Sequence, residues 1–192
     1  MKLSPMNGKP YALWKTLKIL ISTPDLPALD ATPRRGRLSL TELNQKIDRF
    51  LADTNLNTAL RPSIRSAALL WHDYLDESHT ISQNIHSADG SFLHGIMHRR
   101  EQDFGNAKYW FHRVGKHRSF SDIEKQATRL LETNGELELS AKLAPRGDWD
   151  PFAFLDACQQ ASEGHLSFTR VPTLHAIQEI EFDCLLAHLF AK

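Results

Sequence analysis

The chain has 192 residues, of which 41% are hydrophobic and 24% are charged, and this composition is typical of a globular protein with one sizeable core. Lys and Arg together number 23, as do Asp and Glu, which excludes a global field that would favour nucleic acid or an anionic membrane as a partner. No run approaches the roughly 18 to 20 apolar residues that a membrane-spanning helix needs.

The first 37 residues predict an N-terminal arm that lies across the main body. A short amphipathic piece, Tyr11–Ile21, precedes a connector, Ser22–Arg37, in which three prolines remove backbone donors. The apolar run Leu17–Ile21 is short, is interrupted by Lys18 and lacks a following cleavage site, unlike a secretory signal peptide. We therefore expect a cytoplasmic protein whose helical domain occupies residues 38–192.

Two helices are expected directly after the arm. Ser39 and Glu42 form a capping box for the first, which ends near Ala52. The second begins at Pro62, a favourable first-turn residue, and runs to about Ile85. It carries on one flank a polar triplet with the spacing i, i+4 and i+7, namely His72, Asp76 and His79.

The stretch 88–118 concentrates polar residues of chemical interest. A turn with a helix cap is expected at residues 89–91. In the helix that follows, residues at i, i+4 and i+7 share a face, so three polar side chains project together. These are His94, His98 and Glu101.

The rest of the chain predicts four more helices. One follows a break at residues 103–106 and turns Trp110 and Phe111 inward. The others are expected at residues 121–135, 150–164 and 172–191, and the first of these starts with a capping box of Ser121 and Glu124. Because no alternating strand pattern occurs, we expect an all-α, single-domain bundle of about seven helices.

The two polar triplets predict a shared site between neighbouring helices. Helices joined by a short link pack as an antiparallel pair, so imidazoles and carboxylates would converge if the two flanks face each other. Such ligands bind zinc, manganese or iron in helical bundles, with one position open for catalysis. The alternative is that both flanks face solvent. Gly95 stands where a zinc-protease helix carries its glutamate, so that motif is not matched.

Basic residues adjoin the histidine flank. Arg99 and Arg100 follow His98 directly, and Lys108 lies on an aromatic and basic helix at residues 105–116. Arginine forks bind phosphate or carboxylate bidentately, so a small anionic ligand is expected at Arg99, Arg100 and Lys108. In the alternative, these side chains form a solvated helix face.

The last helix is apolar nearly all round and is therefore expected to be buried. Glu181 would then lie inside, where an unpaired carboxylate is costly. It should pair with a histidine, an arginine or a metal. We place it with His72, His94 and His98 in a candidate metal-binding set.

Residues 94–117 show two local resemblances to known proteins. The segment DFGNAKYWFHRVGKH, residues 103–117, resembles the second half of a Sel1-like or tetratricopeptide unit, which implies a helix hairpin packed by alanine and aromatic residues. The longer run HGIMHRREQDFGNAKYWFHRVGKH, residues 94–117, resembles a motif of bacterial and fungal proteins that have no established activity. The second resemblance therefore assigns no role to any residue.

Two functions are compatible with these features. The first is a small enzyme or binding protein with a polar pocket for a divalent metal or an anionic ligand. If it is an enzyme, we expect hydrolysis by a metal-activated water, with His94, His98 and Glu101 as the catalytic residues. The second is a helical interaction module that docks a protein partner on the helix at residues 105–116 without catalysis.

Overall fold

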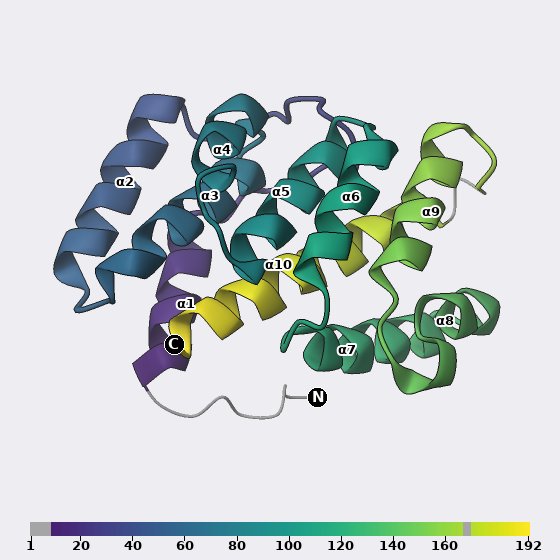
Figure 1. Cartoon of the computed structure of the whole chain (residues 1–192). Coiled ribbons are helices and arrows are strands. Elements are labelled where there is room, and N and C mark those ends of the chain that lie inside the picture. The colour runs from purple at the N-terminus through teal and green to yellow at the C-terminus, as the bar shows by residue number, and fades with distance from the viewer. Residues whose placement is uncertain (1–8, 167–169) are drawn as a thin grey trace.

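The computed structural model describes residues 9–166 and 170–192, and every regular element in these ranges is helical (Figure 1). The α-helices are α1 Lys9–Leu20, α2 Leu40–Asp53, α3 Arg61–Trp71, α4 Leu75–Ser82, α5 Ala88–Arg100, α6 Phe104–Val114, α7 Phe120–Thr133, α8 Leu137–Leu143, α9 Pro151–Ser162 and α10 Val171–Phe190. Short 3₁₀ turns lie at Thr58–Leu60 and Pro145–Gly147. The all-α prediction is confirmed, but the described residues form ten α-helices rather than about seven.

Helix α10 is the central element of the arrangement. It contacts α1, α3, α7 and α9, and in Figure 1 it runs behind α5 and α6. Leu174, Ile177 and Leu185 are fully buried, as expected for a helix that is apolar on all sides. None of the described helices, α10 included, combines the length and the hydropathy that a membrane crossing requires.

The N-terminal segment is part of the core, so the prediction of a proline-rich arm is wrong. Residues 1–8 lie outside the described residues, and Lys9–Leu20 forms α1, which packs against α10. Leu17 is fully buried and Trp14 nearly so. Lys18 forms an ion pair with Asp183 of α10. An amphipathic helix is stable when its apolar stripe is covered, and α10 provides the surface that covers it.

The single helix predicted from Pro62 to Ile85 is divided into α3 and α4 by a tight turn. Asp73 in this turn has a φ of 63°, a left-handed conformation that ends the helix. Its buried carboxylate accepts hydrogen bonds from Arg34 (2.9 Å) and Arg100 (2.7 Å). These two arginines hold Asp73 in place, and the turn removes His72 from the face that carries His79.

Several helix ends form as predicted. Ser39 and Glu42 make the capping box of α2, and Asp150 caps the first turn of α9 with its carboxylate. The glycine after α9, Gly164, has a φ of 72°, the left-handed conformation with which helices commonly end.

Two other predicted helix starts are wrong. Ser87 caps α5, so residues 89–91 lie inside the first helical turn instead of before it. Helix α7 begins at Phe120 after Ser119, without the capping box expected from Ser121. The Ser119 hydroxyl is instead 2.6 Å from Nδ1 of His117. A short helix that was not predicted, α8, also forms between the helices expected at residues 121–135 and 150–164.

Helices α5 and α6 form a closely packed hairpin. A methyl group at Gly95 of α5 would lie 2.8 Å from ring atoms of Phe111 of α6, so a larger residue does not fit without a shift. Phe111 is buried, whereas Trp110 is only partly buried and Tyr109 is 53% exposed. The expectation that Trp110 belongs to the core is therefore wrong. The docking of a partner on α6 stays a prediction.

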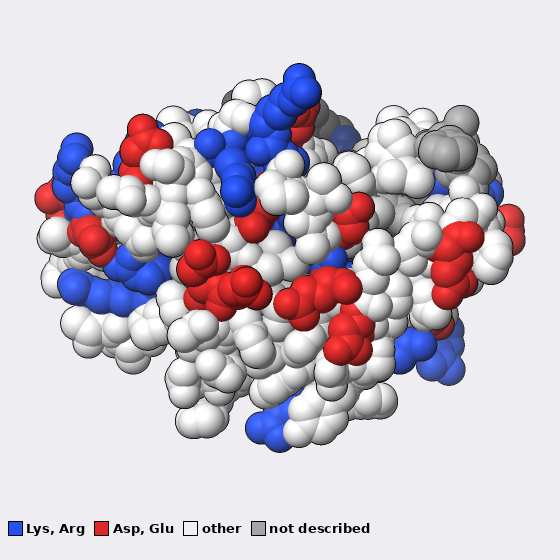
Figure 2. All heavy atoms as spheres, turned by 90° about the horizontal axis from the view of Figure 1, so that it is seen from above, with Lys and Arg blue, Asp and Glu red and all other residues white. Residues whose placement is uncertain are grey.

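Acidic and basic side chains both occur on the face of the molecule that is seen from above (Figure 2). The face seen in Figure 2 carries both signs, with no broad region of one charge. This distribution matches the formal net charge of zero. Recognition of a charged ligand must therefore depend on local clusters.

Candidate metal centre

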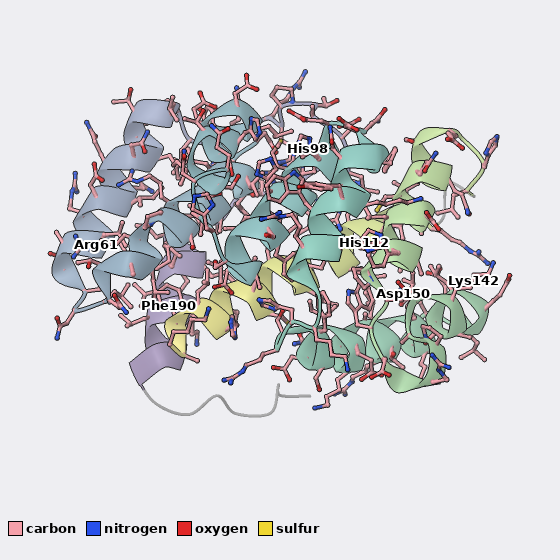
Figure 3. The ribbon with its side chains drawn as sticks, in the orientation of Figure 1. Arg61, His98, His112, Lys142, Asp150 and Phe190 are labelled. Carbon is pink, nitrogen blue, oxygen red and sulfur yellow. The ribbon has the colours of Figure 1, made fainter. Side chains whose placement is uncertain are left out.

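Three histidines converge at one end of the α5–α6 hairpin. His79 comes from α4, and His94 and His98 come from α5. One ring nitrogen from each can be chosen so that all three lie within 4.8 Å of one another. Their ring centroids are 4.6 Å (His79 to His94), 4.9 Å (His94 to His98) and 5.5 Å (His79 to His98) apart. His98 is labelled in Figure 3. We call His79, His94 and His98 the three-histidine cluster.

His98 is held in the tautomer that a metal ligand needs. Its Nδ1 atom lies 3.1 Å from Oε2 of Glu101, which follows α5 directly. A carboxylate accepts hydrogen bonds, so Nδ1 carries the proton and Nε2 keeps its lone pair. Metal-binding histidines commonly donate their second ring nitrogen to a carboxylate in this way, which fixes the orientation of the ring.

His94 is the most buried member of the cluster. It is 2% exposed, and no hydrogen-bond partner for its Nδ1 atom lies among the described residues. Its ring stacks on Trp110 of α6, with the centroids 3.8 Å apart. A buried polar atom without a partner costs roughly 1–3 kcal/mol, so the folded chain keeps this nitrogen at a cost unless a further group binds it.

The cluster disfavours protonated imidazoles. Burial, together with the neighbouring His98 and His79, lowers the pKa of His94 to about 3. Burial also lowers the pKa of His98, although the charges of Glu101 and Asp103 oppose the shift. At neutral pH both rings are therefore neutral, which is the form that binds a metal.

His72, a predicted metal ligand, is used elsewhere. Its Nδ1 atom accepts the backbone N–H of Leu38 at 3.2 Å, so Nε2 carries the proton and donates to the carbonyl of Ile21 at 3.0 Å. Both ring nitrogens are thus engaged by the backbone. Burial lowers the pKa of His72 to about 4, and the neutral ring ties the segment before α2 to the end of α3.

Glu181, the fourth predicted ligand, is paired with an arginine. Nη2 of Arg99 donates to Oε2 of Glu181 at 2.5 Å and to Oε1 of Gln178 at 3.2 Å. All three side chains are fully buried. Glu181 has the partner expected of a buried carboxylate, and that partner is not a histidine.

The three basic residues predicted to bind an anion are not brought together. Arg99 is engaged by Glu181, and the buried Arg100 donates to the carbonyl of Leu70 and to Asp73. Lys108 is 42% exposed and lies 2.8 Å from Asp156 of α9. Neither arginine is exposed to solvent, and each neutralises a buried carboxylate inside the protein.

Sequence reasoning missed a second group of possible ligands, formed by Asp89, His117 and His188. Asp89 lies in the first turn of α5, His117 in the link between α6 and α7, and His188 near the end of α10. No local spacing relates residues so far apart in the chain. His79 has a sequence signal, because it belongs to the polar triplet with His72 and Asp76, but it was not among the predicted metal ligands.

No protein family, curated protein or solved structure matched this chain. The residues expected to be catalytic, His94, His98 and Glu101, lie together, and His79 joins them.

Proposed function

We propose that the three-histidine cluster binds a divalent transition-metal ion and that zinc suits it best. The observation that carries the proposal is the convergence of His79, His94 and His98, with the Nδ1 atom of His94 buried and without a partner. A bound ion would give the three converging imidazoles a common partner.

The donor set decides which metals fit. Three imidazole nitrogens suit zinc, copper, nickel or iron, whereas magnesium and calcium prefer oxygen ligands. Zinc is commonly bound by three histidines in catalytic sites, where the fourth position holds water. The carboxylate of Glu101 behind His98 resembles the outer partner that such zinc ligands use.

The cluster is open enough for chemistry. The His98 side chain is 12% exposed and that of Glu101 is 34% exposed, so the site reaches the surface on the side of these residues. The reaction class that follows is hydrolysis, because a metal-bound water is acidic enough to be a nucleophile near neutral pH. Glu101 contributes as a positioning residue, since its observed partner is His98.

Metal analysis tests the binding proposal. Protein purified without a histidine tag should retain about one zinc per chain after dialysis, as expected of a three-histidine site. His79→Ala and His98→Ala should lose the metal, whereas His86→Ala, which changes an exposed histidine outside the cluster, should keep it. Wild-type protein without zinc affinity, or equal zinc content in all variants, would refute the proposal.

A separate assay tests hydrolysis. Zinc-loaded protein is incubated with p-nitrophenyl phosphate and p-nitrophenyl acetate, and product is followed by absorbance. Turnover should disappear with a chelator and in His98→Ala, and His86→Ala should match wild type. Zinc binding without turnover on either ester would remove the hydrolytic role and leave a metal-binding protein.

A further inference from the structure

A pocket lies at the end of α5 opposite the three-histidine cluster. It has a volume of about 440 Å³ and lies between the first turn of α5, the link between α6 and α7, and the end of α10. Asp89 and His98 are separated along α5 by about 14 Å, from the rise of about 1.5 Å per residue. Figure 3 labels Phe190 near the C-terminal end of α10. We call this cavity the basic pocket, after its side chains Lys116, Arg118 and Lys192.

The carboxylate of Asp89 is fully engaged in the wall of the basic pocket. Its Oδ1 atom lies 3.0 Å from Nε2 of His117 and 3.2 Å from Nε2 of His188, and Oδ2 accepts a hydrogen bond from Lys192. Burial opposes ionisation, but these three partners lower the pKa of Asp89 well below its usual range. Asp89 is therefore an ionised carboxylate that anchors the surrounding side chains.

The hydrogen bonds of His117 argue against a metal ion at this group. Nδ1 of His117 accepts the backbone N–H of Ser119 at 3.2 Å, so the ring proton is on Nε2, where it is donated to Asp89. A metal would need the lone pair of Nε2, which this tautomer does not offer. The contrast with His98 is direct, because there the proton lies on Nδ1 and Nε2 is free.

The basic pocket instead has an excess of positive charge. Among its side chains, Lys116, Arg118 and Lys192 each carry a positive charge, and Asp89 carries a negative charge. Lys116 and Arg118 are exposed, and within the described ranges neither has an ion-pair partner. The first turn of α5 adds the partial positive charge of a helix N-terminus.

We propose that the basic pocket binds a phosphate group, carried by a small organic molecule. The Arg118 guanidinium can donate two parallel hydrogen bonds to one phosphate, and Lys116 and Lys192 provide point charges beside it. Small-molecule pockets measure roughly 300–1,000 Å³, so 440 Å³ holds a phosphate together with the group that it esterifies. The proposal does not depend on the metal centre.

Calorimetric titration of metal-free protein with inorganic phosphate and phenyl phosphate tests the proposal. Both probes should bind saturably at low ionic strength, and tighter binding of phenyl phosphate would identify an ester as the ligand rather than the free ion. The double variant Lys116→Gln/Arg118→Gln should weaken binding at least about tenfold, as expected when charge-assisted hydrogen bonds are lost. Both side chains are exposed, so the fold should persist.

The control makes the same change of charge elsewhere. In Lys125→Gln/Arg129→Gln two exposed residues of α7 are replaced, and the affinity for both probes should match that of wild type. No saturable binding, or equal weakening in the two double variants, would overturn the proposal. Zinc binding that survives His98→Ala and is lost in His117→Ala would also overturn it, because the pocket would then be a cation site.

Discussion

The imidazole of His94 stacks on the indole of Trp110, with ring centroids 3.8 Å apart and planes inclined by 19°. Arg113 lies over the same indole, 5.3 Å from its centroid, so Trp110 is in contact with a neutral ring and a cation. Trp110 thus holds the most buried member of the three-histidine cluster. The packing of α5 on α6 and the orientation of the candidate ligand depend on the same contact.

The variant Trp110→Ala should affect the site more than the stability. Trp110 is partly exposed, so we expect a loss of about 1–2 kcal/mol, against the roughly 3–5 kcal/mol of a fully buried phenylalanine such as Phe111. Zinc affinity should fall because the ring of His94 loses its support. Urea denaturation and zinc titration of Trp110→Ala and Phe111→Ala measure both effects, and equal destabilisation by the two variants would contradict this account.

Acid should destabilise the protein through His94. Its pKa is about 3 in the folded chain and about 6.5 in the unfolded chain, so the unfolded chain binds more protons between these values. The neutral ring therefore makes its full contribution to the free energy of unfolding above about pH 6.5. This contribution decreases as the pH falls towards 3, by up to about 1.4 kcal/mol per pH unit.

Denaturation of the metal-free protein by urea at several pH values between 7.5 and 5 measures this slope. The difference between wild type and His94→Gln isolates His94 from other groups that titrate, among them His72, whose pKa is also lowered by burial. The variant should show the shallower dependence, and His86→Ala should follow wild type. Parallel curves for wild type and His94→Gln would show that His94 is not held neutral by the fold.

A methyl group at Gly95 should destabilise the α5–α6 hairpin. The added Cβ would lie 2.8 Å from two ring atoms of Phe111, and this rigid ring is buried against Phe92. Overpacking of this kind costs roughly 1–3 kcal/mol, although alanine is otherwise the better helix former. Thermal denaturation of Gly95→Ala checks the prediction. If Gly95→Ala is instead more stable than wild type, α5 and α6 can move apart to admit the methyl group without a loss of stability.

Removal of one partner of the Arg99–Glu181 pair should be more costly than removal of both. Glu181→Gln leaves the guanidinium of Arg99 buried without a countercharge, for which we expect a loss of about 3–5 kcal/mol. Arg99→Met combined with Glu181→Leu should regain most of that loss, because no buried charge remains. Chemical denaturation of the single and double variants measures the coupling, and additive losses would contradict it.

The sequence alone was sufficient for features that depend on neighbouring residues. The capping box of Ser39 and Glu42 and the ends of α9 were predicted because caps act within one turn of a helix. The burial of α10 followed from apolar residues on all its sides. The cost of an isolated charge in the interior predicted that Glu181 has a partner, but the sequence placed it with three histidines and a metal, whereas the structure pairs it with Arg99.

Tertiary structure decided which histidines meet. Helical spacing placed His72 and His79 on one flank, but Arg34 and Arg100, both distant in the sequence, bind Asp73 and turn the chain between them. His79 therefore lies against α5, and His72 bonds to the backbone before α2. The basic pocket likewise joins three segments that no sequence period relates. The periodicity of a sequence shows only which residues share a face of one helix, whereas ion pairs and packing between helices bring the residues of a site together.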